Sequence, residues 1–275
     1  FEEAKLPIIY AGNSRALPFI ENRLRQKFLL KVCSNITPTE GAKNFLPARN
    51  AIIDTFVNHV MSSAPGYKNL MRKALLPPLP TPLAVERILR FYSMIEKKKI
   101  FAVDIGGATT DCYSVSQDSI ERTVAANLGL TYSLPYVLQT CSIDKIMNCL
   151  NKSFNKQEVL NFIGNRYIRP TTISETEREL QIEEAIDRNI LVQAVLQHKE
   201  WTKEMRYDIV ICSGGFFAYH PDKMRLKKIV IDTLKLSPKC DIAIDKHFIL
   251  THLGSLSRVN EKLALKLFSE NVYFV

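Results

Sequence analysis

Glycine is scarce in this chain, and its cysteines and apolar residues are spread in a way that excludes several classes of protein. Only 10 of the 275 residues are glycine. The 6 cysteines include no Cys-x-x-Cys pair, which argues against a zinc or iron–sulfur site. No apolar run approaches the roughly 20 residues that a membrane-spanning helix needs. We therefore expect a protein of the reducing cytoplasm with no membrane contact.

The positive charge of the chain does not by itself indicate nucleic-acid binding. The formal net charge is +9 at pH 7, and short basic clusters stand at 97–99 and 225–228. The other lysines and arginines are dispersed, and no basic stripe is interleaved with aromatic residues. We interpret the charge as solvated basic faces and expect no nucleic-acid partner. Steering of nucleotide anions, or contact with an acidic partner, is an alternative use of this charge.

An apolar run that ends in a polar turn, between residues 101 and 115, is the most informative stretch. Its letters, Phe-Ala-Val-Asp-Ile-Gly-Gly-Ala-Thr-Thr-Asp-Cys-Tyr-Ser-Val, predict a strand, a tight turn and a second strand. Gly106 and Gly107 let the backbone approach an anion, and successive N–H groups form an anion-binding concavity. Asp104 and Asp111 carry the hard oxygens that Mg²⁺ prefers. Taken alone, such a turn is more often an ordinary hairpin.

A second glycine pair follows another predicted buried strand, within residues 207–217. The apolar residues 209–211 lead into Ser213-Gly214-Gly215, so the two pairs use four of the 10 glycines. Both pairs stand where a hydrophobic strand ends, which is where open α/β sheets bind ligands. The two segments together favour a phosphate site over a plain hairpin.

These two segments resemble the phosphate motif (104–111) and the adenosine motif (209–217) of the actin, heat-shock-chaperone and sugar-kinase ATPases. The whole chain resembles, more narrowly, the MutL (GlmL-type) family associated with glutamate mutase. Other parts of the family's pattern occur in order: Pro7-Ile-Ile-Tyr-Ala-Gly-Asn13, Leu46-Pro-Ala-Arg49, Pro80-Thr-Pro-Leu-Ala-Val85, Arg122-Thr-Val, Leu128-Gly-Leu and Asp245-Lys-His-Phe-Ile-Leu250. The resemblance implies an α/β protein with the actin-like ATPase (ribonuclease H-like) fold, and ATP and Mg²⁺ as cofactors.

The resemblance also implies roles for the residues of the phosphate turn. Asp104 would be the catalytic residue, which either positions Mg²⁺ through a bound water or activates that water. Backbone N–H groups would bind phosphate oxygens at Gly106, Gly107 and Ala108, and hydroxyls would come from Thr109 and Thr110. Catalysis would then consist of positioning and charge neutralisation.

The remaining candidate residues support these two motifs. Gly214 and Gly215 would approach the adenosine and the α-phosphate, with Ser213 beside them. Asp111 would hold either a water near the metal or, the interpretation we favour, its own turn through a bond to the backbone. Phe216 and Phe217 would stack on adenine or fill the core, and core is favoured for at least one.

Domain organisation follows from the same resemblance. The superfamily has two phosphate hairpins, and the first, Asp-x-Gly-Ser/Thr-x-Thr near the N-terminus, does not occur in this chain. Since the chain starts at Phe1 and enters a predicted strand at once, we expect a fragment that lacks this hairpin. Residues 1–96 would complete the first lobe, and residues 97–275 would form the second, with the boundary at the lysine run 97–99.

Apolar spacing, capping residues and turn residues predict the order of elements along the chain. Strands are expected at 6–11, 29–33, 207–212 and 241–244, with a hairpin over 100–124. Helices are expected at 16–28, 47–61, from 81 onward, within 134–164, and at 175–198, 221–235 and 257–269.

Three functions are compatible with these observations. The first is an accessory, chaperone-like ATPase module that reactivates or assembles an adenosylcobalamin-dependent mutase such as glutamate mutase. The nucleotide part of this hypothesis rests on residues, and the mutase part rests on the family resemblance alone. The second is a small-molecule kinase of the same superfamily, which would need a base at the cleft. The third is a non-catalytic nucleotide-binding scaffold, so whether the chain is an enzyme stays open.

Overall fold

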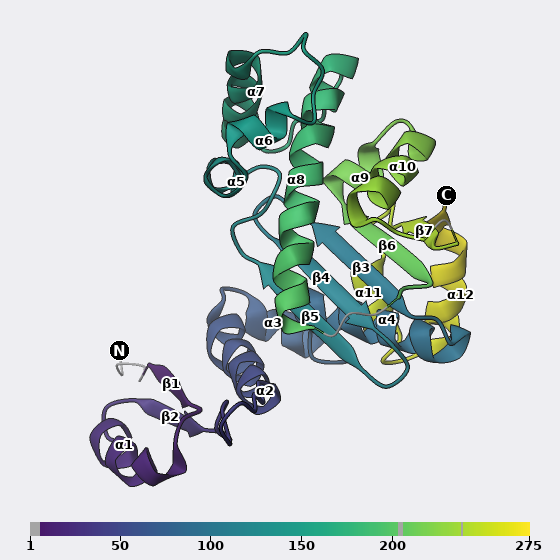
Figure 1. The fold of residues 1–275 in the computed structure, drawn as a ribbon. Coiled ribbons are helices and arrows are strands. Elements are labelled where there is room, and N and C mark those ends of the chain that lie inside the picture. The colour runs from purple at the N-terminus through teal and green to yellow at the C-terminus, as the bar shows by residue number, and fades with distance from the viewer. Residues whose placement is uncertain (1–5, 203–205, 238) are drawn as a thin grey trace. The chain divides into compact units, whose positions relative to one another are not determined.

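The computed structural model of the chain describes residues 6–202, 206–237 and 239–275 (Figure 1). Contacts divide the chain into two compact units, Phe1–Pro80 and Thr81–Val275. The division between these compact units falls between residues 80 and 81, before the lobe boundary that we predict at the lysine run 97–99. The helix that precedes this run, α4 (Thr81–Glu96), belongs with the second unit because its apolar face packs into that unit's core. The assignment of the units to two lobes stays a prediction.

The first unit is small and buries little apolar surface. Its parallel strands β1 (Pro7–Tyr10) and β2 (Leu29–Val32) are joined through η1 (Ser14–Ala16) and α1 (Leu17–Leu24). The remaining helical segments are α2 (Leu46–Thr55), the π-helical turn η2 (Phe56–Val60), η3 (Met61–Ser63) and α3 (Tyr67–Lys73). Among the described residues of this unit only Ala48 and Ala51 are buried.

The second unit is built on a six-stranded sheet in the order β5-β4-β3-β6-β7-β8. Its strands are β3 (Ile100–Ile105), β4 (Thr110–Val115), β5 (Ile120–Ala125), β6 (Ile209–Gly214), β7 (Asp241–Ile244) and β8 (Tyr273–Phe274). Strands β3, β4 and β5 form an antiparallel meander, and β6 and β7 continue the sheet parallel to β3. A meander extended by two parallel strands beside its first strand is the ribonuclease H-like arrangement, which confirms the predicted α/β fold class.

Helices cover both faces of this sheet, as Figure 1 shows. On one face lie α8 (Glu177–Trp201), α9 (Gly215–Tyr219) and α10 (Lys223–Leu234). On the other lie α4, α11 (Leu250–Leu256) and α12 (Glu261–Asn271). The short helices α5 (Leu134–Cys141), α6 (Ile143–Met147) and α7 (Lys156–Ile168) pack beside α8.

The sheet separates two hydrophobic cores because successive residues of a strand point to opposite faces. On β3, Phe101, Val103 and Ile105 enter the core beneath α8, whereas Ile100 and Ala102 enter the core beneath α4. The central strands are apolar on both faces, as buried parallel strands usually are. This explains the near-continuous apolar runs that the sequence shows before each glycine pair.

Most of the predicted elements are present, with shifts at their ends. Strand 241–244 coincides with β7, and the helix predicted over 175–198 corresponds to α8. The short helices α3, α9 and α11 were not predicted. None of the helices in the described ranges is long and apolar enough to span a membrane.

The start of α8 is specified locally by a capping box. The Thr176 hydroxyl accepts a hydrogen bond from the Glu179 N–H at 3.2 Å, and the Glu179 carboxylate accepts one from the Thr176 N–H at 3.2 Å. These bonds satisfy two of the backbone donors that a helix start leaves unpaired. The apolar residues Ile182, Ile186 and Ile190, spaced four apart, then hold the helix against the sheet.

Asp187 is an exception to the apolar face of α8. It is fully buried, and neither carboxylate oxygen has a hydrogen-bond partner among the described residues. Burial, reinforced by the nearby charge of Glu183, raises the pKa of the Asp187 carboxyl well above its usual range. Burial therefore favours the neutral form of this side chain in the folded protein.

We expect Asp187→Leu to raise the free energy of unfolding at pH 7.5 by about 1–3 kcal/mol, because a buried unsatisfied polar group is removed. A carboxyl whose folded pKa is raised contributes stability that is present below its unfolded pKa and is lost as the pH rises through the folded pKa. The gain should therefore be smaller at pH 4. Urea denaturation at both pH values measures it, with the exposed Asp232→Leu on α10 as control. A variant no more stable than the parent at pH 7.5 would contradict this account.

The helices α4 and α11 approach each other more closely than ordinary side chains permit. A Cβ atom placed on Gly254 would lie 1.8 Å from the Ala84 carbonyl oxygen and 2.4 Å from its carbon. Both residues are buried in the core beneath α4. The contact is between backbones, so a rotamer change cannot relieve the clash.

We expect Gly254→Ala to lower the free energy of unfolding by about 2 kcal/mol or more, because the two helices must separate to admit the methyl group. Gly164→Ala in α7 is the matched control, since nothing lies within 4 Å of the position that its Cβ would take. The control should gain roughly 0.5–1 kcal/mol from helix propensity. Thermal and urea unfolding of both variants measure the difference. Equal stability of the two variants would overturn this description of the α4–α11 contact.

Candidate functional site

Four polar residues lie side by side across one end of the sheet. Asp104 on β3 is paired in register with Asp111 on β4 and with Ser213 on β6. The Ser213 hydroxyl donates to Asp245, which directly follows β7, at 3.4 Å. Asp104 points to the same side of the strand as Ala102, so this row faces α4 and α11. A hollow of about 210 Å³ opens there, lined in part by Asp104, Ser213 and Asp245.

The electrostatics of this row centre on Asp104. Burial, together with the charges of Asp111 and Asp245, raises the pKa of the Asp104 carboxyl to about 6, and Ser213 opposes the shift by hydrogen bonding. The carboxylate is therefore destabilised by its surroundings, as expected for a negative group that lacks a counter-charge. A cation beside the Asp104 carboxylate would offset the free-energy cost of its burial and the repulsion from Asp111 and Asp245.

Asp245 connects this row to α11. Its carboxylate is buried and accepts hydrogen bonds from the backbone N–H groups of Ile249 at 2.8 Å and Leu250 at 3.3 Å. Burial nevertheless raises the pKa of Asp245 above its usual value, and these two bonds only partly offset the shift. Asp245 belonged to the family pattern in the sequence, but its place in the site was not predicted.

The favoured interpretation of Asp111, a bond to the backbone of its own turn, is wrong. Asp111 lies within β4, and Arg122 on β5 donates to its Oδ1 through Nε at 2.8 Å and a terminal nitrogen at 2.6 Å. Both side chains are largely buried. Arg122 neutralises Asp111, so Asp104 is the carboxylate of the β3–β4 pair without a basic partner among the described side chains.

The turn between β3 and β4 presents its backbone donors. The segment after β5 binds its carbonyls: Leu130 N–H donates to Gly106 at 3.0 Å, Thr131 N–H to Gly107 at 3.0 Å, and the Ser133 hydroxyl to Ala108 at 2.5 Å. In the described part of the chain, no group accepts a hydrogen bond from the N–H of Gly107, Ala108 or Thr109. Unpaired successive N–H groups with engaged carbonyls are the pattern of an anion-binding turn.

Thr110 has a different role from the predicted one. Its side chain is fully buried, and its hydroxyl donates to the Leu128 carbonyl at 2.8 Å. The hydroxyl thus ties β4 to the segment that supports the turn and does not face a ligand. Thr109 closes the turn by accepting from the Gly106 N–H at 2.9 Å through its carbonyl, and its hydroxyl role stays a prediction.

The two glycines after β6 differ in what they do. Gly214 has a φ of +115°, and a Cβ there would lie 2.2 Å from the Ile105 carbonyl oxygen, so this glycine is required by the packing of β6 on β3. Gly215 begins α9 and lines a pocket. Phe216 and Phe217 are both buried in the core beneath α8, which confirms that at least one of them fills the core, and Phe216 also lines the pocket.

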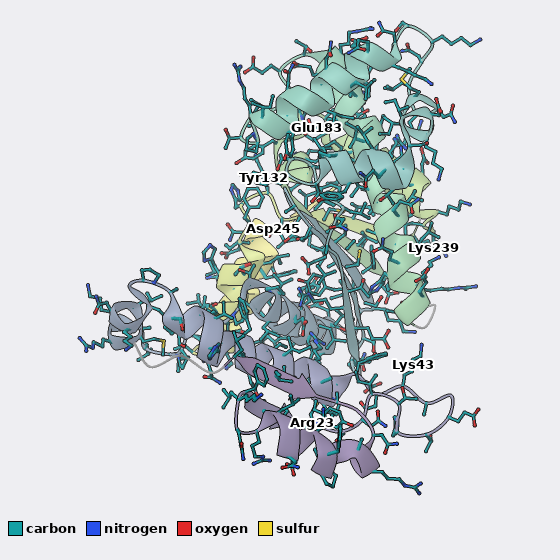
Figure 2. All side chains as sticks on the ribbon, turned by 90° about the vertical axis from the view of Figure 1, so that its left-hand side faces the viewer. Arg23, Lys43, Tyr132, Glu183, Lys239 and Asp245 are labelled. Atoms are coloured by element: carbon teal, nitrogen blue, oxygen red, sulfur yellow. The ribbon has the colours of Figure 1, made fainter. Side chains whose placement is uncertain are left out.

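This pocket, of about 420 Å³, lies on the α8 side of the strand ends, opposite the row of carboxylates. Gly106, Gly107 and Gly215 line it, so the structure brings the two predicted glycine motifs together. Its other principal lining residues were not predicted from the sequence, and they are Tyr132, Arg166, Glu183 and Tyr219. Figure 2 labels Tyr132, Glu183 and Asp245, which come from separate segments of the second unit.

One feature of the sequence could have predicted part of the pocket lining, the segment that carries Tyr132. Gly129 stands between two leucines, and a Cβ there would lie 2.6 Å from the Gly107 carbonyl oxygen. The glycine therefore lets the chain lie directly against the turn, with Tyr132 carried alongside. A Cβ on Gly107 would in turn meet the Thr131 hydroxyl oxygen at 2.5 Å and the Tyr132 ring at 3.4 Å. No comparable pattern marks Arg166 or Glu183.

The residues present fit a nucleotide phosphate better than a metal held by protein side chains alone. In the described ranges, no group of three or more His, Cys, Asp or Glu side chains could hold a metal ion. A Mg²⁺ ion would need ligands from phosphate and water, with Asp104 as the adjoining carboxylate. The unpaired N–H groups of the turn suit the phosphate that such an ion accompanies.

The class of protein defined by this geometry is an α/β protein with a ribonuclease H-like sheet and a glycine hairpin at its strand ends. The chain belongs to the MutL family, since the family model described as "MutL protein" matches residues 2–272. Protein MutL of Clostridium tetanomorphum is 24% identical over 300 residues, which cover 92% of this chain and 63% of that protein. The chain thus spans about 63% of the length of this curated relative.

Solved structures give weaker similarities. The ethanolamine utilization protein EutJ from Carboxydothermus hydrogenoformans is 15% identical, with a TM-score of 0.40 over 87% of this chain and 71% of that one. Component A of (R)-2-hydroxyglutaryl-CoA dehydratase from Acidaminococcus fermentans is 14% identical, with a TM-score of 0.38 over 82% and 87%.

We expect Asp104→Asn to stabilise the nucleotide-free protein at pH 7.5 and to have little effect at pH 4. The folded pKa is raised from 3.8 to about 6, so the carboxyl contributes stability below the unfolded pKa that is lost as the pH rises through about 6. Between pH 4 and pH 7.5 the gain in the free energy of unfolding should grow by on the order of 2 kcal/mol. Urea denaturation at the two pH values measures it, with the exposed Asp118→Asn as control. A gain that does not depend on pH would contradict burial and charge repulsion as its cause.

Proposed function

We propose that this chain is the nucleotide-binding part of an accessory ATPase, with ATP and Mg²⁺ at the end of the β3–β4–β6 sheet. The observation that carries the proposal is the turn 106–109, whose carbonyls are engaged and whose N–H groups at 107–109 have no acceptor in the described structure. The adjoining pocket of about 420 Å³ is in the range of small-ligand sites.

Each part of the chain would then have a defined task. The N–H groups of Gly107 and Ala108 would bind phosphate oxygens, and Gly215 would leave room beside them. Asp104 would orient a water bound to the metal ion. The nearby cation would favour the ionised form of Asp104, because its charge offsets the cost of burying the carboxylate. Magnesium supplies neutralisation of phosphate charge when it is bound.

The partner is proposed from the family resemblance. Membership of the MutL family, with its association to glutamate mutase, supports an adenosylcobalamin-dependent mutase as the protein that this ATPase reactivates or assembles. A change in the angle between the two lobes of the intact protein on ATP binding would alter the grip on that partner. Because the chain spans 63% of its curated relative, this activity would belong to the intact protein.

The kinase alternative is less well supported by the side chains. A kinase would need a base at the cleft, and His220 is the histidine that lines the pocket. Its Nε2 lies 2.9 Å from Glu184 Oε1 and its Nδ1 accepts from the Asp222 N–H at 3.1 Å. Both nitrogens are therefore occupied in holding α9 and α10 to α8.

We expect the intact protein that contains this sequence to bind ATP in the presence of Mg²⁺. Asp104→Ala should lower the Mg²⁺-dependent affinity for ATP by about tenfold or more, roughly 1.4 kcal/mol. Isothermal titration calorimetry with and without Mg²⁺ measures it. Asp118→Ala, in the exposed β4–β5 turn, is the matched control and should bind as the parent does.

The outcomes separate the two parts of the proposal. Absence of ATP binding by the parent would overturn the nucleotide function and leave a scaffold. ATP binding without any effect on the turnover or reactivation of an adenosylcobalamin-dependent mutase would overturn the partner alone.

A further inference from the structure

A buried arginine holds the loop between α7 and α8 against the pocket. Arg166, near the end of α7, is 8% exposed. Its guanidinium donates to the Thr172 carbonyl and, at 3.0 Å, to the Ser174 hydroxyl, and it stacks over the Phe162 ring at 5.2 Å. These contacts attach residues 172–174 to α7 at two points.

The same guanidinium is paired with a carboxylate of α8. An Arg166 terminal nitrogen lies 3.2 Å from Glu183 Oε1, and the Ser174 hydroxyl donates to Glu183 Oε2 at 2.6 Å. Both charged side chains are almost entirely buried, with 9% and 12% of their surface exposed. Arg166, Ser174 and Glu183 therefore form a closed network that joins α7, the loop and α8, and we name it the loop latch.

The loop latch lies between two hollows. One is the pocket of about 420 Å³ at the glycine turns, and the other is a groove of about 1190 Å³ between α7 and the start of α8. Arg166 and residues 171–174 line both. The loop is thus the wall between the pocket and the groove, and the latch keeps that wall in place.

The energetics of the pair do not explain its presence. A buried ion pair is often no more stabilising than apolar side chains of the same volume, because both ions lose their hydration. What the pair provides beyond packing is a defined position for the loop, since a planar guanidinium binds several acceptors in one geometry. A defined loop position fixes the shape of the pocket that the loop lines.

We propose that the loop latch closes the far end of the nucleotide pocket and sets the largest nucleobase that the pocket accepts. The direction of the nucleotide rests on the proposed function: phosphates at Gly106 and Gly107 place the base at the opposite end. Tyr132, whose ring lies against Gly107, marks the turn end, and Glu183 lies farther toward α7 (Figure 2). Arg166 and Glu183 are positioning residues that act through the loop.

The test compares ATP with an ATP analogue that carries a bulky benzyl group on the N6 amino nitrogen. The principal variant is Arg166→Met with Glu183→Leu, which removes both charges and so avoids one buried unpaired ion. Arg178→Met is the matched control, because Arg178 also binds a carboxylate (Glu158), a backbone carbonyl (Ser153) and an aromatic face (Phe154). Arg178 lines the larger groove and not the pocket.

We expect the parent and Arg178→Met to bind ATP at least about tenfold more tightly than the benzyl analogue, because the wall rejects the added group. The double variant should bind the two within about threefold, with calorimetry as the measurement. Equal binding of both nucleotides by the parent, or continued rejection of the analogue by the folded double variant, would overturn the proposal.

A measurement without nucleotide separates this proposal from the proposed function. Hydrogen exchange of the amides of residues 171–174 should be faster in the double variant than in the parent or Arg178→Met, because the loop loses its attachment. Unchanged exchange would overturn the latch even if ATP binds. Faster exchange in a protein whose parent binds neither nucleotide would show that the latch holds the loop, while overturning the nucleotide function and with it the size limit.

Discussion

The candidate site depends on one packing constraint, the contact of the segment 128–133 with the β3–β4 turn. Gly129 lies so close to the turn that any Cβ would strike the Gly107 carbonyl. Leu130, Thr131 and Ser133 then satisfy the turn's carbonyls, while the Thr110 hydroxyl binds the Leu128 carbonyl. A backbone whose acceptors are engaged on one side can direct its donors to the other, which is how a short hairpin becomes an anion site.

Two more glycines allow close backbone contacts near the candidate site. Gly214 allows β6 to end against Ile105, and Gly254 allows α11 to lie on α4. Asp245 joins the two regions, since its carboxylate faces Ser213 and also accepts hydrogen bonds from the start of α11. A shift of the carboxylate row would therefore be felt by α11 and by its backbone contact with Ala84.

The buried carboxylates of the second unit differ in whether a basic side chain neutralises them. Asp111 is neutralised by Arg122, and Glu183 by Arg166, so both are accommodated in the fold. Asp104 is instead held beside other carboxylates, and burial raises its pKa to about 6. A site that destabilises its own carboxylate is suited to binding a cation, because the interaction energy released on binding is larger. Asp187 has a raised pKa as well, but it lies in the α8 core away from the row.

The amino-acid sequence by itself determined the α/β class, the two strand–glycine motifs and the capping of α8, because each depends on neighbours within a few residues. Apolar runs predicted β3, β6 and β7, and the Gly-Gly pairs marked where two of these strands end. The tertiary structure decided which residues meet there. Asp111 turned to Arg122 on the next strand, Thr110 was buried, and Arg166 and Glu183 reached the pocket from helices far along the chain. Their roles depend on strand order and on which helix covers which face, and such long-range packing leaves no local periodicity to detect.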